Sequence, residues 1–283
     1  MGILSGLEGF GLGNLETKDI FQDQTKKAQT QSNAQPVEFQ ESDFVFAKTY
    51  TCPVCDTEFR SKTVKIGKAK LIGTDLDLRP KYEIIDSLKY DVILCPKCGY
   101  AALSRYFQYI TDPQAKLIKT HISTSFHNNP PKGDIYTYDE AIERYKLALA
   151  NAIVKRGKNS EKAYICLKMA WVVRGKMENL DQNQPDYKQV LATCKQEEDE
   201  LLKNSLEGFL AARQAESFPM CGMDESTVDY LISVMSMRFD QLDVAAKLVS
   251  NIILSPTTNK RMKDKARDLK ELLVVQIRKQ NNK

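Results

Sequence analysis

The tetrapeptide Cys52-Pro53-Val54-Cys55 is repeated after 39 intervening residues as Cys95-Pro96-Lys97-Cys98, which Gly99 follows. Each segment has the pattern Cys-Pro-x-Cys, and we call each one a knuckle. Two knuckles can present four thiolates at the corners of a tetrahedron, which is how proteins hold structural zinc. The repeat therefore predicts one metal site with Cys52, Cys55, Cys95 and Cys98 as its ligands. It also predicts that the residues between the knuckles fold around that site.

Zinc is the expected metal, because four thiolates in a reducing compartment suit it. Tetrahedral sulfur coordination does not separate zinc from iron, so iron held as in rubredoxin is the alternative. Since cysteines fill all four positions, the site is expected to be structural, with no position open to a water or a substrate. The chain has two histidines, His121 and His127, and it lacks the motifs of zinc proteases, phosphate-binding loops and serine hydrolases. We therefore expect a protein that is not an enzyme.

The composition predicts a cytoplasmic protein. No apolar run reaches the ~18 residues of a membrane-spanning helix, and the first residues lack the basic and apolar segments of a signal peptide. Seven cysteines are an odd number, unlike the even sets of secreted disulfide frameworks. Cys166, Cys194 and Cys221 lie outside the knuckles and are expected to be small, buried side chains.

Four segments are expected along the chain. Residues 1–46 combine glycines, scattered apolar residues and a glutamine-rich stretch, which predicts a flexible leader or, alternatively, a short apolar motif that docks on a partner. Residues 47–111 are expected to form a small β-rich domain, because β-prone stretches at 59–66, 71–72 and 90–94 accompany the knuckles, as in zinc ribbons. Residues 112–136 contain Asp-Pro and Asn-Asn-Pro-Pro breakers and are expected to be a connector with a short helix.

From residue 137 to residue 283 the apolar period is helical. Thr137 and Glu140 predict a capping box at the first helix, which should end at Gly157. Further helices are expected at 160–175, 187–217, 225–238, 240–255 and 260–277. Residues 139–149 resemble the second helix of a tetratricopeptide repeat, in which small and aromatic side chains let helices approach closely. The predicted fold class is therefore α+β, with a zinc-ribbon-like domain followed by an all-α, tetratricopeptide-like domain of helical hairpins. A generic helical bundle is the alternative for this second part.

A polar cluster lies between the knuckles, where Asp75, Asp77 and Arg79 alternate with leucines ahead of Tyr82. Alternation places these polar side chains on one face of an extended strand. The strand could be a solvated edge, or Asp75, Asp77, Arg79 and Tyr82 could form a recognition surface. A third interpretation is a brace in which Arg79 pairs with a carboxylate near the metal.

The net charge of +4 is unevenly distributed, because residues 260–283 carry nine basic and three acidic side chains. Such a basic last helix could contact nucleic acid, although it is more often the solvated face of a helix. Residues 52–98 carry nine basic and seven acidic side chains, so four thiolates around a zinc ion would make the segment neutral. Zinc ribbons that bind nucleic acid usually have a basic excess, which weakens this interpretation.

The segments Thr51-Cys52-Pro53-Val54-Cys55, Asp75-x-Asp77-x-Arg79-Pro80-x-Tyr82 and Tyr90-Asp91-x-x-x-Cys95-Pro96-x-Cys98-Gly99-Tyr100-Ala101 occur in this order. Together they resemble the bacterial domain-of-unknown-function family 2225. The resemblance covers roughly residues 47–280 and is most specific in its first third. It implies a double-knuckle segment, a bound metal and tetratricopeptide-like helices, and it supplies no substrate or catalytic residue.

The function expected from these features is that of a non-enzymatic, zinc-stabilised adaptor. Its helical part would offer a concave groove to a protein or peptide partner, as stacked helical hairpins do. The alternative is a nucleic-acid-binding or regulatory protein that uses the knuckles and the basic last helix. A redox protein with iron at the knuckles is a third possibility.

Overall fold

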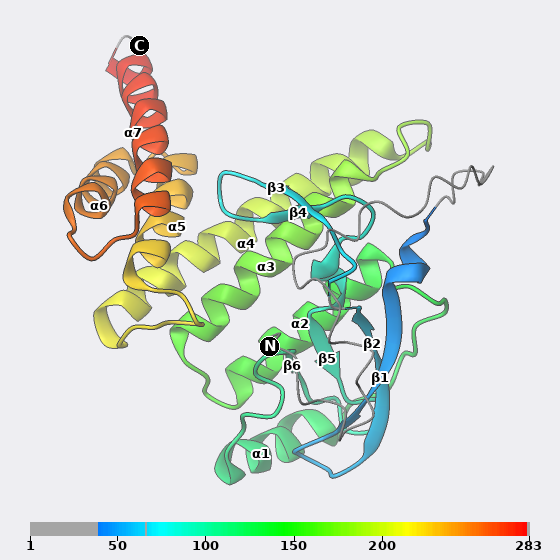
Figure 1. The fold of residues 1–283 in the computed structure, drawn as a ribbon. Coiled ribbons are helices and arrows are strands. Elements are labelled where there is room, and N and C mark those ends of the chain that lie inside the picture. The colour runs from blue at the N-terminus through cyan, green and yellow to red at the C-terminus, as the bar shows by residue number, and fades with distance from the viewer. Residues whose placement is uncertain (1–38, 66, 282–283) are drawn as a thin grey trace, which may run out of the picture. The chain divides into compact units, whose positions relative to one another are not determined.

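Figure 1 shows the computed structural model, which describes residues 39–65 and 67–281. This part of the chain belongs to the α+β class, with three two-stranded antiparallel sheets and seven α-helices. The predicted leader lies outside the described residues as far as residue 38. From there a short 3-10 turn, η4 (Glu41–Phe44), leads into the first strand, so folded structure begins ahead of residue 47.

Each knuckle is the turn of a hairpin. Strand β1 (Val45–Thr51) pairs with β2 (Glu58–Val64), and the first knuckle joins them. Strand β5 (Val92–Leu94) pairs with β6 (Ala101–Leu103) across the second knuckle. Between them lies the hairpin of β3 (Leu71–Thr74) and β4 (Pro80–Tyr82). The predicted strand segments correspond to β2, β3 and β5, and the expectation that hairpin strands end in the knuckles is confirmed.

The helices follow in the predicted order. Helix α1 (Asp112–Ile118) continues into one π-helical turn, η6 (Lys119–Ser123), inside the predicted connector. The remaining helices are α2 (Tyr138–Val154), α3 (Asn159–Glu178), α4 (Tyr187–Ala215), α5 (Glu225–Arg238), α6 (Leu242–Leu254) and α7 (Lys260–Asn281). The capping box of α2 is confirmed, because the Thr137 side chain accepts from the Glu140 amide and Glu140 accepts from the Thr137 amide.

Three predicted helix ends were wrong. Helix α3 begins at Asn159, one residue before the predicted cap Ser160, and it passes through Gly175 to Glu178. Gly175 is needed inside this helix for close packing, since a Cβ there would lie 2.6 Å from Asp86 Oδ2 and 2.7 Å from the Tyr138 ring. The predicted cap Asp240 has a φ of 57°, and the residue before α6 is Gln241.

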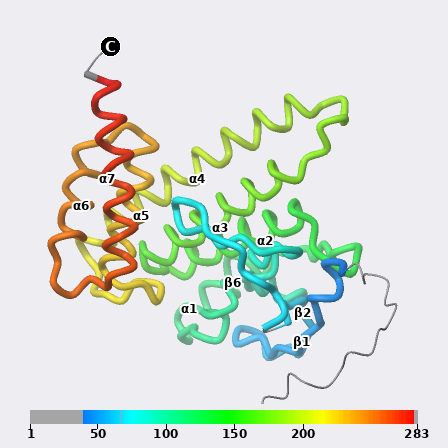
Figure 2. The backbone as a smooth tube through the Cα atoms, turned by 45° about the horizontal axis from the view of Figure 1, so that its top comes forward, coloured from blue at the N-terminus to red at the C-terminus, as the bar shows by residue number. Residues whose placement is uncertain are grey.

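Consecutive helices pack on each other, α2 on α3, α3 on α4, α5 on α6 and α6 on α7. Figure 2 shows α5, α6 and α7 together beside one end of α4, and these three helices have an apolar core of their own. Helix α2 also packs on β5 and β6. The largest core accordingly joins Val92 and Leu103 of these strands to side chains of α2, α3 and α4. The knuckle hairpins and the helices therefore share one apolar core. None of the described helices has the length and apolar character needed to cross a lipid bilayer.

Candidate metal centre

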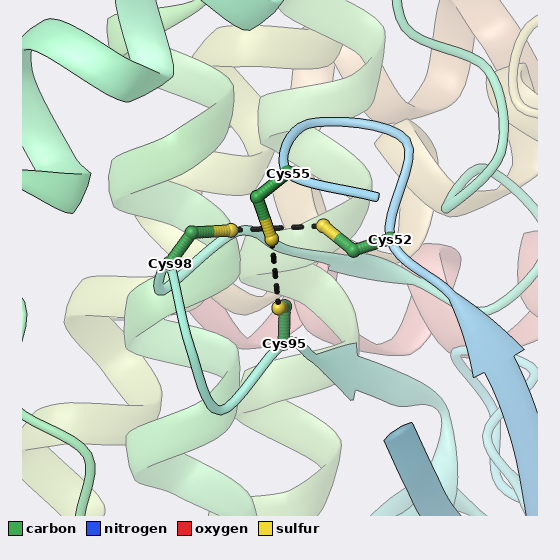
Figure 3. A group of neighbouring side chains, drawn as sticks. All are labelled: Cys52, Cys55, Cys95 and Cys98. Carbon is green, nitrogen blue, oxygen red and sulfur yellow. Dashed lines mark hydrogen bonds between the residues drawn. The ribbon is translucent and has the colours of Figure 1, made fainter. Parts of the chain in front are cut away.

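The two knuckles bring four cysteine sulfurs together (Figure 3). All four lie within 4.8 Å of one another, and the pairs Cys52–Cys98 and Cys55–Cys95 are each 3.6 Å apart at Sγ. A disulfide would need about 2.05 Å. A tetrahedral ion with metal–sulfur bonds of about 2.3 Å would space its sulfurs by about 3.8 Å. The four thiols are therefore arranged to hold a metal ion, as the sequence predicted.

The two knuckles have the same backbone hydrogen bonds. In the first, the Cys52 amide donates to Thr57 O at 3.0 Å and the Asp56 amide donates to Cys52 O at 2.9 Å. In the second, the Cys95 amide donates to Tyr100 O at 2.9 Å and the Gly99 amide donates to Cys95 O at 3.1 Å. Both turns close through a residue with positive φ, 56° at Asp56 and 72° at Gly99. Glycine adopts this region freely in the second knuckle, and aspartate tolerates it in the first.

An apolar shell surrounds the site. Cys52, Cys95 and Cys98 are buried, and Cys55 is partly exposed. The shell consists of Val54, Phe59, Ile93, Tyr100, Ala102, Phe107 and Ile118. The ring of Tyr100 packs on Phe107, and the Tyr100 hydroxyl donates to Phe107 O at 3.1 Å. Water therefore has little access to three of the four sulfurs.

Three residues outside the hairpins fix the second knuckle. Asn151 of α2 is fully buried and donates from Nδ2 to Gly99 O at 3.0 Å. Ser123 of η6 donates to Cys98 O at 2.9 Å. The Phe126 ring covers Gly99 so closely that a Cβ there would lie 2.5 Å from the ring. Sequence reasoning missed these three, although Asn151 gave one signal, a polar residue on the apolar face that carries Ala148 and Ala152.

The thiols shift each other's protonation. Contacts with the thiols of Cys52 and Cys98 lower the pKa of Cys95, and the backbone amides of Lys97 and Cys98 act in the same direction. The contact with Cys95 raises the pKa of Cys52, and the contact with Cys52 raises that of Cys98. Close packing of the thiols therefore stabilises one thiolate at the expense of the others, and a bound cation must displace the remaining protons.

The polar cluster between the knuckles is not the extended strand that its alternation predicted. Residues 75–79 form the turn between β3 and β4, where the Leu78 amide donates to Asp75 O at 3.0 Å and the Asp75 amide donates to Arg79 O at 2.9 Å. Leu78 has a φ of 67°, which closes the turn and ends the alternation. The prediction was wrong because a tight turn can carry the same pattern of residues as a short strand.

Asp77 and Arg79 face the helices and are only 5% and 4% exposed. Asp77 accepts from Trp171 Nε1 at 2.9 Å and pairs with Arg174 Nη2 at 2.7 Å. Arg79 pairs with Glu178 at 2.9 Å. Such buried side chains hold the hairpin against α3 and leave no surface for docking. The predicted brace near the metal was wrong, because the carboxylates that pair with Arg79 are Glu178 of α3, Asp75 and Asp86.

The other residues of the predicted recognition surface also contribute to packing. Asp75 pairs with Arg174 at 3.1 Å and with Lys81 at 3.0 Å, and these two hydrogen-bonded cations hold its pKa below the usual value although burial opposes them. Tyr82 packs against the apolar cluster around Phe44. The histidines His121 and His127 are exposed. Cys166 and Cys194 are buried as expected, whereas Cys221 is partly exposed.

Comparison with known proteins shows which family the chain belongs to. Residues 45–273 match the family model described as "Uncharacterized protein conserved in bacteria (DUF2225)". The chain belongs to this family. The resemblance drawn from the knuckles and the Asp75–Tyr82 segment is thereby confirmed.

A curated relative in the bacterium Borreliella burgdorferi (strain ATCC 35210 / DSM 4680 / CIP 102532 / B31) carries the description "Uncharacterized protein". It is 28% identical to this chain over 112 residues, which cover 35% of this chain and 40% of the relative. The match therefore spans less than half of the relative's length. No solved structure matches the chain.

Proposed function

We propose that this member of the DUF2225 family is a non-enzymatic cytoplasmic adaptor. In this proposal a structural zinc ion in a zinc-ribbon-like site stabilises the first part of the fold. A tetratricopeptide-like arrangement of helices then receives a protein or peptide partner. One observation carries the partner-binding role, an open groove walled by α2 and α4 with α3 as its floor.

The groove has a volume of about 520 Å³. Leu149 and Ile153 of α2 line one wall, Leu201 of α4 lines the other, and Met169 of α3 lies between them. Ile153 is 58% exposed, an unusually large apolar exposure beside a groove. Grooves of this kind, with two helices flanking a third, are where stacked helical hairpins bind extended peptides.

The proposal of zinc rests on the donor set. Four thiolates fill a tetrahedral site, and an apolar shell leaves no room for a substrate at the ion. Iron satisfies the same geometry, so metal analysis of the purified protein decides between them. We expect a colourless protein with one equivalent of zinc, and a red protein with one equivalent of iron would contradict this assignment.

Photo-crosslinking in living cells tests the partner-binding role on the intact chain. Asn204 lines the groove and is exposed, so a crosslinking amino acid placed there should capture one partner protein. Lys195 is exposed on the opposite side of the same helix, nine positions earlier, and it provides the matched control. Ile153→Asp should abolish the Asn204 crosslink without changing thermal stability. Equal crosslinking from Asn204 and Lys195, or none from either, would contradict the proposal.

Nucleic-acid binding is the second candidate, because α7 exposes basic side chains that include Arg261, Arg267 and Lys270. This candidate predicts binding to DNA or RNA that weakens steeply with salt. A reverse-charge variant, Lys270→Glu, should then lower the affinity, whereas Lys203→Glu on α4 should not. If no binding occurs at low salt, this candidate is excluded.

A further inference from the structure

A pocket larger than the groove lies beside it, and Lys146 of α2 lines both. It has a volume of about 870 Å³, within the range of roughly 300–1,000 Å³ that is usual for small-molecule sites. One wall comes from the N-terminal half of α2, and the other comes from η6 and residues 125–137. Apolar side chains from both walls line it, namely Leu94, Ile122, Phe126, Ile135 and Leu147.

A buried cation, Arg144 of α2, also lines this pocket. Arg144 is only 8% exposed, and burial lowers the pKa of its guanidinium. Its Nε and Nη2 atoms donate to Val92 O at 3.3 and 3.1 Å, and Nη2 also donates to Ser61 Oγ at 3.3 Å. Nη1 donates to no atom of the described residues, and no carboxylate among them forms an ion pair with Arg144. The Glu140 carboxylate opposes this lowering of the pKa from a distance, but no carboxylate of the described chain pairs directly with the buried guanidinium, so its free edge can receive an anion.

A second cation, Lys62, shares the aromatic ring of Tyr136 with Arg144, although it is not among the residues that line the pocket. The guanidinium of Arg144 lies 4.5 Å from the centre of the Tyr136 ring, and Lys62 Nζ lies 4.6 Å from the centre of the same ring. Lys62 donates to the carbonyl oxygens of Gly133 and Ile135 and, among the described residues, has no ion pair either. Two cations thus meet at one aromatic ring with carbonyl and hydroxyl oxygens as their acceptors.

The acidic residues of the pocket limit the charge of an anion that could bind. Asp139 pairs with Lys176, and Glu140 accepts the amides of Thr137 and Lys132. Glu143 is exposed at the rim. These carboxylates would repel a dianion such as phosphate more strongly than a monoanion. A planar guanidinium edge also fits a carboxylate group geometrically.

We propose that this pocket binds a small organic acid, with its carboxylate at Arg144 and its apolar body along the walls. The proposal does not depend on the adaptor role, because it concerns a different pocket, which shares only Lys146 with the groove. It assigns a ligand class, an apolar monocarboxylate, to a site where apolar walls surround a buried guanidinium that forms no ion pair among the described residues.

Calorimetry on the intact, metal-loaded chain tests the proposal with decanoate and 1-decanol as probes. Both probes have the same apolar body, and only decanoate carries the charge. We expect saturable binding of decanoate, and binding of decanol at least about ten times weaker, since hydrogen bonds to charged groups are worth more than neutral ones. Absence of saturable decanoate binding, or equal affinities for the two probes, would overturn the proposal.

Two variants locate the binding. Arg144→Met should reduce decanoate affinity to that of decanol, but it could also disturb the fold. Glu143→Lys changes an exposed side chain and should leave the fold intact, while it raises decanoate affinity severalfold and leaves decanol binding unchanged. Glu207→Lys on α4 is the matched control, because Glu207 is exposed and lines none of these cavities. If Glu143→Lys and Glu207→Lys change decanoate affinity equally, the effect is one of overall charge and the pocket is not the site.

Discussion

Asp56 and Gly99 occupy equivalent positions in the two knuckles, and each closes its turn with a positive φ. A side chain at this backbone conformation costs roughly 1–2 kcal/mol unless it is a small polar one. In the second knuckle the covering ring of Phe126 adds a steric restriction that the first knuckle lacks. The two positions therefore have the same backbone conformation but accept different side chains.

The variant Gly99→Ala should lower the free energy of unfolding of the metal-loaded protein by at least about 2 kcal/mol, from backbone strain together with the displaced ring. Asp56→Gly is the matched control and should change it by less than about 1 kcal/mol, because glycine adopts positive φ freely. Urea denaturation followed by circular dichroism measures both values. Equal stabilities of Gly99→Ala and the natural protein would contradict the geometry described for Phe126.

Gly175 illustrates a competition between propensity and packing. Within a helix, alanine is favoured over glycine by roughly 1 kcal/mol. At this position the alanine Cβ would meet Asp86 Oδ2 and the Tyr138 ring below 3 Å, so we expect Gly175→Ala to destabilise the protein despite its better propensity. Gly133→Ala serves as the control, since the nearest atom to its Cβ would be 3.8 Å away. A higher melting temperature for Gly175→Ala would show that Asp86 and the Tyr138 ring move aside easily.

At the scale of elements, the β3–β4 hairpin depends on charge for its attachment. Strand β3 is exposed along its length, and the turn that follows holds α3 through Asp77 and Arg79. Arg174 is central, because it pairs with Asp75 at 3.1 Å, with Asp77 at 2.7 Å and with Glu198 of α4 at 2.7 Å. This one side chain therefore joins the hairpin to two helices.

Arg174→Met should lower the free energy of unfolding by about 3–5 kcal/mol, because the buried carboxylate of Asp77 loses its cation and keeps only the Trp171 N–H, while Glu198 keeps only Arg238. Arg267→Met breaks the exposed ion pair with Asp264 on α7, and it should lower the free energy of unfolding by less than about 1 kcal/mol. Chemical denaturation of both variants gives the comparison. If the two variants lose similar amounts of unfolding free energy, the ion pairs of Arg174 contribute no more to stability than a surface ion pair.

The elements differ in how far the sequence could predict them. The helices from α2 onward carry a clear apolar period, and Thr137 and Glu140 mark a helix start by local chemistry alone. Strand β1 was missed because nearly all of its residues are exposed, so no alternation of apolar side chains marks it. The contact between Asp77 and Trp171 joins residues 94 positions apart, and local patterns contain no information about it. The cysteine site was predictable because one ion requires four ligands of one kind at a fixed spacing.

At the scale of the whole molecule, the shared core couples the metal site to the helices. Helix α2 packs on β5 and β6, while α6 and α7 pack on α5, which also adds Val228 and Leu231 to the largest core. Loss of the metal should therefore reach α2 before it reaches the last three helices. Structural metal sites contribute on the order of 10 kcal/mol to small domains, so the effect should be large.

Cys95→Ser should abolish metal binding and increase hydrogen exchange in the knuckle hairpins and α2, with α5–α7 still protected. Cys194→Ser is the matched control, a buried cysteine outside the site that should leave metal content unchanged. Hydrogen-exchange mass spectrometry of the two variants resolves these regions. Full metal content in Cys95→Ser would show that the four cysteines are not the ligands. Uniform exchange from β1 to α7 would show that the last helices do not hold together on their own.

The segment between the knuckles, residues 56–94, is fastened at three points, and the turn between β3 and β4 is its tip. Its two ends meet at the cysteine cluster, and its tip is held by α3. The stretches between these points, at 67–70 and 83–84, are mostly exposed turns. Length changes during evolution should therefore accumulate in these two stretches. The ends and the tip, by contrast, can accept substitutions only where the ion and the buried charges are preserved.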